Sequence, residues 1–240
     1  MIEQVDILVF AAHPDDAELS CSGTIMKHIE AGSKVAIVDL TQGELGSRGT
    51  KDSRYAEAAD ASKIMGIHFR ENLKMKDGWF QGDEENKRLV IEQIRRFRPK
   101  VVLANAINDR HPDHGKGSQL VSEACFLSGL RKIETKWNNS PQKHHRPQAV
   151  YHYIQDYYIK PDFVVDVTPF LDRKIAAIQA FKTQFYNPDS KEPTTPISGE
   201  DFITFIKARM MEMGRPAGMK FAEGFTAERS VGVENLLGLK

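Results

Sequence analysis

Short apolar runs alternate with amphipathic segments along most of the chain. A near-continuous apolar run, typical of a strand that is covered on both faces of a sheet, predicts a strand at residues 5–12, and further strands are predicted at residues 35–40, 69–73, 101–104, 149–154 and 163–167. Apolar residues at helical spacing predict helices at residues 19–31, 53–65, 86–97, 116–130 and 170–185. This alternation indicates an α/β fold with a Rossmann-like, doubly wound, mostly parallel sheet flanked by helices.

Two clusters of polar residues follow the first and the fourth predicted strands. The first cluster reads HPDDAE at residues 13–18, and the second reads RHPDH at residues 110–114. In a doubly wound sheet these two strands are neighbours, and the ligand crevice lies outside their carboxyl ends, at the switch point of the topology. The side chains expected in this active-site crevice are His13, Asp15, Asp16, His111, Asp113 and His114.

Each cluster also has an ordinary structural interpretation. An aspartate before a helix is commonly an N-cap, and a turn that contains proline is common after a strand. Either cluster alone is compatible with that interpretation. Two such clusters at adjacent strand ends favour a functional site instead.

Imidazole and carboxylate groups in one crevice are typical of a divalent metal site. Cys21 and Cys125 lie in predicted helices among small or apolar residues, which indicates buried thiols rather than a disulfide or a zinc pair. Zinc is the first expectation, and other divalent metals stay open. Two histidines and one aspartate leave a fourth position open for catalysis, and a further carboxylate and histidine can move protons in amide hydrolysis. The spacing leaves open which of His111 and His114 binds the metal.

The composition excludes several other classes of function. The chain of 240 residues has 33 basic and 33 acidic residues, so no net charge attracts nucleic acid or an anionic membrane surface. No run approaches the ~18 apolar residues of a membrane span, and no signal peptide is apparent. We therefore expect a cytoplasmic protein that forms one domain over residues 1–240, with 40% hydrophobic content to build its core.

The two clusters resemble the motifs of a known family. HPDDAE and HPDH are similar to those of the LmbE-like, or N-acetylglucosaminyl-phosphatidylinositol de-N-acetylase, superfamily of zinc amidohydrolases. Further similarity lies in DLTQGELGSRGTKDSRYAEAA (39–59), SGLRKI (128–133), KPDFVVDVT (160–168), QAFKTQF (179–185) and FAEGF (221–225). The nearest resemblance is to the bacillithiol-biosynthesis branch, whose members convert N-acetylglucosaminyl-malate into glucosaminyl-malate and acetate.

The resemblance implies a role for each polar residue of the crevice. It implies one zinc ion per chain, with the ligands His13, Asp16 and His114. Asp15 would be the general base, and His111 would stabilise the oxyanion or protonate the leaving amine. Asp113 would orient His111. The resemblance thus selects His114 as the metal ligand, a choice that spacing alone does not make.

The resemblance also implies a small-molecule amino-sugar substrate and a homo-oligomer, for example a hexamer. Arg54 and Arg110 match basic positions that hold sugar hydroxyls and the carboxylates of the aglycone. Their structural alternatives are a solvated helix face for Arg54 and an ion pair for Arg110. Two alternative functions remain. One is a related amidohydrolase that acts on another N-acetyl sugar, such as a chitooligosaccharide, or on a thiol-conjugate amide. The other is a non-catalytic domain that binds a sugar or nucleotide in the same crevice.

Overall fold

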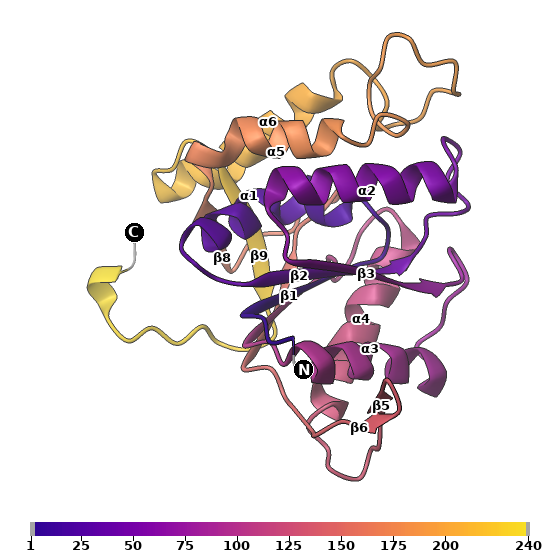
Figure 1. Ribbon diagram of the computed structural model, residues 1–240. Coiled ribbons are helices and arrows are strands. Elements are labelled where there is room, and N and C mark those ends of the chain that lie inside the picture. The colour runs from indigo at the N-terminus through magenta and orange to yellow at the C-terminus, as the bar shows by residue number, and fades with distance from the viewer. Residues whose placement is uncertain (1–2, 239–240) are drawn as a thin grey trace.

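A seven-stranded sheet lies between two layers of helices in the computed structural model, which describes residues 3–238 (Figure 1). The strands are β1 (Ile7–Ala11), β2 (Val35–Thr41), β3 (Phe69–Met75), β4 (Val101–Ala104), β7 (Ala149–Tyr153), β8 (Phe163–Asp166) and β9 (Ala222–Ala227), with a separate ribbon of β5 (Lys136–Trp137) and β6 (Ser140–Pro141). The α-helices are α1 (Asp16–Glu30), α2 (Lys51–Met65), α3 (Glu84–Phe97), α4 (Pro112–Leu127), α5 (Leu171–Gln179) and α6 (Phe202–Gly214). Three short 3₁₀ helices are η1 (Thr168–Phe170), η2 (Arg215–Ala217) and η3 (Leu236–Gly238).

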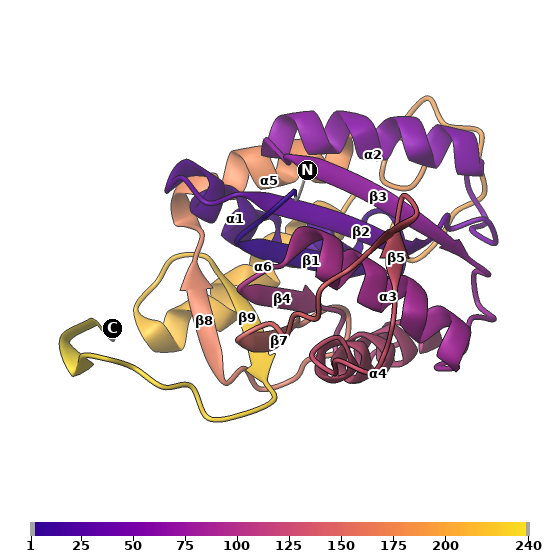
Figure 2. The ribbon, with the colours of Figure 1, turned by 60° about the horizontal axis from the view of Figure 1, so that its bottom comes forward.

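The sheet has the doubly wound order that the sequence predicts. Its strands lie in the order β3-β2-β1-β4-β7-β9-β8, and the first five of them pair in parallel (Figure 2). Strand β1 is flanked by β2 and β4, so the chain changes direction across the sheet between β1 and β4. The predicted fold class is confirmed.

Helices cover both faces of the sheet, as the apolar strands require. Helices α3 and α4 lie on one side, whereas α1, α2, α5 and α6 lie on the other (Figure 1). Every residue of β1 and β2 is buried. Packing on both sides fixes the carboxyl ends of these strands, so the polar residues that follow them start from a rigid base.

Two C-terminal elements were not predicted from the sequence. Strand β9 inserts between β7 and β8 and is antiparallel to both, and helix α6 packs against it. The apolar pattern of β9 is interrupted by Glu223 and Gly224. A Cβ atom on Gly224 would lie 2.8 Å from the Met213 sulfur and 3.1 Å from Ile154 Cδ1, so a larger residue here would displace these side chains, and the glycine serves packing rather than a turn. The helix predicted over residues 170–185 is shorter in the structure, where α5 ends at Gln179.

Helix α1 is broken at Cys21, whose backbone leaves the helical region (φ −139°, ψ 15°). A buried ion pair fills the break: Lys174 Nζ lies 2.7 Å from Glu223 Oε1, and both side chains are 1% exposed. Lys174 donates to the carbonyls of Glu18 and Leu19 before the break. Glu223 accepts from the backbone N–H groups of Gly23 and Thr24 after it. The pair thus supplies partners for helix-end groups that would otherwise be buried without any.

Tyr153 gives a direct test of one interior hydrogen bond. Its fully buried hydroxyl donates to the Phe10 carbonyl at 2.9 Å. We expect Tyr153→Phe to lower the free energy of unfolding by about 1 kcal/mol, because one buried hydrogen bond is lost while the ring stays. Tyr151→Phe is the matched control on the same strand, since within residues 3–238 its hydroxyl makes no hydrogen bond. Urea unfolding measures both, and equal losses would contradict the assignment.

No helix within residues 3–238 has the length and the apolar character needed to cross a membrane.

Candidate active site

The two polar motifs meet at the carboxyl ends of β1 and β4. They line a cleft of about 380 Å³ that is also bordered by the loop after β2, the loop after β3 and helix α6. The ring centroids of His13 and His111 are 4.5 Å apart, and those of His13 and His114 are 5.5 Å apart. Residues almost a hundred positions apart in sequence therefore form one cluster at the switch point.

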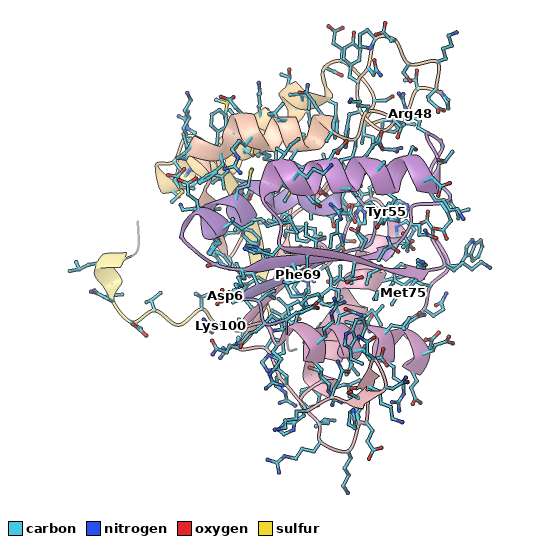
Figure 3. The ribbon with its side chains drawn as sticks, in the orientation of Figure 1. Asp6, Arg48, Tyr55, Phe69, Met75 and Lys100 are labelled. Atoms are coloured by element: carbon cyan, nitrogen blue, oxygen red, sulfur yellow. The ribbon has the colours of Figure 1, made fainter. Side chains whose placement is uncertain are left out.

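The loop after β2 is held in place by Arg48, which forms one wall of the cleft. Its guanidinium donates to the Thr183 carbonyl at 2.6 Å, to the Pro193 carbonyl at 3.1 Å and to the Ser190 hydroxyl at 2.9 Å. Arg48 thereby joins this loop to the segment that follows α5, beside which it lies in Figure 3. The glycine-rich loop is thus fixed to the C-terminal part of the chain.

Asp16 lies close to both histidines of the ligand set that the family resemblance implies. His114 Nε2 lies 3.1 Å from Asp16 Oδ1, and His13 Nδ1 lies 3.7 Å from Asp16 Oδ2. The other ring nitrogen of His114 is 2.5 Å from Asp109 Oδ2. Because a carboxylate accepts, Nδ1 donates to Asp109 and Nε2 is the ring atom that could bind a metal, an arrangement common behind metal-binding histidines. Burial opposes ionisation of Asp16, but the His114 and His13 imidazoles hold its pKa well below the usual value.

The donor set fits a divalent cation. Two groups of three donor atoms lie within 4.8 Å of one another: His13, His111 and His114, and His13, Asp77 and Asp113. Imidazole nitrogen and carboxylate oxygen are the ligands that zinc takes in catalytic sites. Both groups share His13, so this side chain is the centre of the cluster.

Asp15 is held in a strained backbone conformation beside the cluster. Its φ of 126° lies in a region that non-glycine residues rarely adopt. Asp15 stands at the N-cap position of α1, yet its side chain makes no capping hydrogen bond. The carboxylate instead accepts from Arg54 Nη1 at 3.2 Å. The capping interpretation therefore does not describe this side chain, and strain of this kind is typical of functional sites.

Burial raises the pKa of Asp15 to about 7, although the Arg54 guanidinium acts in the opposite direction. A carboxylate with a pKa near neutrality can accept a proton from water and release it again at physiological pH.

Arg54 lies behind Asp15 rather than on a solvated helix face. Its side chain is buried and donates to the Pro14 carbonyl at 3.0 Å, to Asp15 and to the Gln184 amide oxygen. Cβ atoms on Gly43 or Gly46 would each lie 3.1 Å from its guanidinium nitrogens. The two glycines let the loop after β2 pack closely over Arg54. Arg54 in turn fixes the orientation of the Asp15 carboxylate.

His111 is the N-cap of α4. Its Nδ1 accepts from the Asp113 backbone N–H at 3.3 Å, which leaves Nε2 for the cleft. Burial lowers the pKa of His111, with His13 and His114 adding to the effect. The Asp113 carboxylate does not contact this ring: it accepts from the Gly78 N–H at 2.7 Å and lies 3.5 Å from His13 Nε2. The contact between Asp113 and His111 is thus made by the backbone, whereas the Asp113 side chain faces His13.

Arg110 lies at the rim of the cleft and forms an ion pair. Its Nε donates to Asp156 Oδ2 at 2.9 Å, with the two side chains 48% and 37% exposed. An exposed pair of this kind adds little to stability.

The sequence analysis missed three polar residues that surround the cluster. Asn105 donates to Asp16 Oδ2 at 2.9 Å, Gln155 donates to Asp16 Oδ1 at 3.1 Å, and Asp77 lies 3.1 Å from His13 Nε2. Asn105 and Gln155 stand one and two residues after β4 and β7, and Asp77 stands two residues after β3. Their position after a parallel strand was the available signal, because the carboxyl ends of these strands share one edge of the sheet.

Comparison with known proteins places the chain in a family. The family model described as PIG-L, GlcNAc-PI de-N-acetylase, matches residues 8–125, the span that contains both polar motifs. A solved structure, the conserved protein TT1542 from Thermus thermophilus, is 34% identical, covers 97% of this chain and 99% of its own, and has a TM-score of 0.86. The chain belongs to the PIG-L family. As a member of this deacetylase family it is an enzyme that acts on an amide.

Two curated proteins that resemble this PIG-L family member carry named activities. The diacetylchitobiose deacetylase of Thermococcus kodakarensis is 26% identical over 91% of this chain and 81% of its own length. The probable N-acetyl-alpha-D-glucosaminyl L-malate deacetylase 2 of Bacillus anthracis is 24% identical over 75% of this chain and 81% of its own length. Both are similar over most of their length, so the likeness is not limited to the two motifs.

Proposed function

We propose that this chain is a zinc-dependent N-deacetylase that hydrolyses the acetamide of N-acetylglucosaminyl-malate to give glucosaminyl-malate and acetate. The observation that carries the proposal is the position of a buried, strained carboxylate, Asp15, directly beside a convergent set of imidazole and carboxylate donors. Buried carboxylates with a raised pKa are common at catalytic sites, which favours an enzyme over a domain that only binds a sugar.

In this proposal His13, Asp16 and His114 hold the metal. Asp109 fixes the ring of His114, while Asn105 and Gln155 fix the two oxygens of Asp16. Supporting contacts of this kind are typical of metal ligands. When bound, zinc polarises the amide carbonyl and lowers the pKa of water.

Asp15 accepts the proton of the attacking water. The Arg54 guanidinium holds the carboxylate in place through the 3.2 Å contact. The water oxygen forms a bond to the acetyl carbon, and the carbonyl oxygen gains negative charge. His111 Nε2 donates a hydrogen bond to this oxyanion, since Nδ1 already accepts from the backbone. The carbonyl then re-forms as the C–N bond breaks, the sugar nitrogen takes the proton that Asp15 accepted from the water, and acetate is released.

The anionic substrate is supported by the basic rim of the cleft and by the Bacillus anthracis relative. The second candidate substrate is diacetylchitobiose, which the Thermococcus relative favours. In this proposal the enzyme is cytoplasmic, each chain forms a single domain, and the chains assemble into a homo-oligomer.

A substrate panel tests the proposed function. The purified protein is assayed for free amine and acetate with N-acetylglucosaminyl-malate, diacetylchitobiose and methyl N-acetylglucosaminide. We expect the highest kcat/KM for the malate conjugate. A higher kcat/KM for diacetylchitobiose would show that the reaction is correct but that the malate conjugate is not the preferred substrate. If none of the three compounds released acetate, the proposed deacetylation of N-acetylglucosaminides would be wrong.

A further inference from the structure

The segment that follows α5 carries a buried glutamine, Gln184, that the proposed chemistry does not use. Its side chain is 4% exposed and lies in the wall of the cleft. Phe181 and Phe185, on either side of it, are buried. Both belong to the apolar cluster that contains Ala58 and Ala61 of α2. The backbone that bears Gln184 is therefore packed firmly against this helix.

Helix α2 also holds the preceding residue, Thr183, through polar contacts. The Glu57 carboxylate accepts from the Thr183 backbone N–H at 2.7 Å and from its hydroxyl at 2.8 Å. Glu57 is buried and lies three residues after Arg54, so the two side chains leave the same face of the helix. Helix α2 thus fixes Gln184 in a position beside Arg54.

The amide of Gln184 is fully engaged by protein atoms. Its Oε1 accepts from Arg54 Nη2. Its Nε2 donates to the Arg48 carbonyl at 2.7 Å and to the Thr183 hydroxyl at 2.9 Å. These partners determine the orientation of the amide, because a guanidinium only donates and a carbonyl only accepts.

The Arg54 guanidinium depends on Gln184 for its own orientation. Nη1 donates to the Pro14 carbonyl and to the Asp15 carboxylate, whereas Gln184 is the one acceptor for Nη2 within residues 3–238. Nε is buried with no partner in the same part of the chain. Because the guanidinium is planar and rigid, an acceptor at Nη2 fixes the direction in which Nη1 points. Without Gln184 a second buried donor would be unpaired, which favours rotation of the group away from Asp15.

We propose that Gln184 is a positioning residue for the base: it acts through Arg54 to hold the Asp15 carboxylate beside the metal ligands. This inference rests on the proposed role of Asp15 in deacetylation. Gln184 takes no part in the reaction itself, since both of its polar groups already have protein partners. Its contact with the Arg48 carbonyl also connects the glycine-rich loop after β2 to the base.

Gln184→Met tests the assignment, because methionine keeps the approximate length and volume of the side chain and removes both polar groups. We expect kcat for the preferred substrate of the panel above to fall about tenfold to a hundredfold, since a small displacement of the base is costly. KM should stay within about twofold of the wild-type value, because no contact with the substrate is lost. An unchanged kcat, with or without a higher KM, would overturn the proposal.

Gln93→Met is the matched control. Gln93 is also buried and also accepts from an arginine, Arg96, at 3.4 Å, but it lies on α3 outside the cleft. We expect both variants to lose stability in urea unfolding and only Gln184→Met to lose turnover. Equal losses of kcat in the two variants would reveal a general effect of losing a buried amide, which contradicts positioning.

A double-mutant cycle with Arg54→Met shows whether Gln184 acts through Arg54. In the Arg54→Met background we expect Gln184→Met to change kcat by less than about twofold, because the group that it positions is absent. The same fold-loss in both backgrounds would mean that Gln184 acts by another route, and the proposal would be wrong.

Urea unfolding tests the same relay without turnover. The cycle combines Gln184→Met with Asp15→Ala, two side chains that have Arg54 as their shared partner. The strain that alanine adds at this φ is present in both arms and cancels. We expect the two substitutions to be coupled about fivefold in the equilibrium constant of unfolding, and the coupling to vanish in the Arg54→Met background. Additive effects would overturn the proposal even in an active deacetylase, whereas coupling in a protein that releases no acetate would contradict only the proposed reaction.

Discussion

Replacing Asp15 by asparagine is expected to lower kcat by a factor on the order of 10² to 10⁴, while the metal content stays at the wild-type level. Asparagine has the same shape as aspartate and similar backbone preferences, so the substitution adds little strain at this position. It can still accept a hydrogen bond from Arg54, but it cannot take a proton from water. The change therefore isolates the proposed role of Asp15 as the base.

The measurement is steady-state acetate release, combined with elemental analysis for zinc. Asp52→Asn, an exposed position in the first turn of α2, is the control for the loss of one acidic charge. Turnover of Asp15→Asn near the wild-type rate would show that this carboxylate only supports the surrounding structure.

Alanine substitutions of the two histidines of the HPDH motif are expected to have different effects on zinc content and turnover. His111→Ala should retain about one zinc ion per chain and lose a factor on the order of 10² to 10³ in kcat, because its donor meets the oxyanion in the transition state. His114→Ala should lose zinc, since His114 carries the Asp109 contact and lies 3.1 Å from Asp16.

Zinc content and single-turnover rates of the two variants decide between these roles. Zinc loss in His111→Ala with retention in His114→Ala would exchange the two assignments. His13→Ala is the reference for a ligand, since His13 belongs to both convergent donor groups. Its zinc content should match that of His114→Ala.

The central strands of the sheet could be predicted because their sequences are mostly apolar, and their order follows from the doubly wound topology. Strands β1 and β2 are buried along their whole length, so a continuous apolar run describes them well. The position of the two polar motifs then follows from the topology alone. Strand β9 could not be found in this way, because its buried Glu223 has the sequence signature of an exposed residue. Its partner, Lys174, lies 49 positions earlier in the chain.

The roles within the site were harder to predict than its location. Both His111 and His114 lie at the start of one helix, so their spacing does not distinguish a ligand from a proton donor. Three-dimensional contacts separate them: the ring of His114 is held by Asp109, whereas the ring of His111 is held by a backbone N–H. The burial of Arg54 against Asp15 was also hidden at the level of sequence, because its helix carries many exposed polar residues.

The break in α1 has a consequence for the order in which the enzyme matures on the ribosome. Both polar motifs are complete once residue 114 has been synthesised, yet the break at Cys21, in the helix that begins at Asp16, is held by Lys174 and Glu223. A nascent chain that ends before β9 has no carboxylate to accept from the N–H groups of Gly23 and Thr24. The partners of this helix break are therefore complete only when the last strand of the sheet is inserted, so we expect a partial translation product to carry both motifs beside a helix that is not yet fixed.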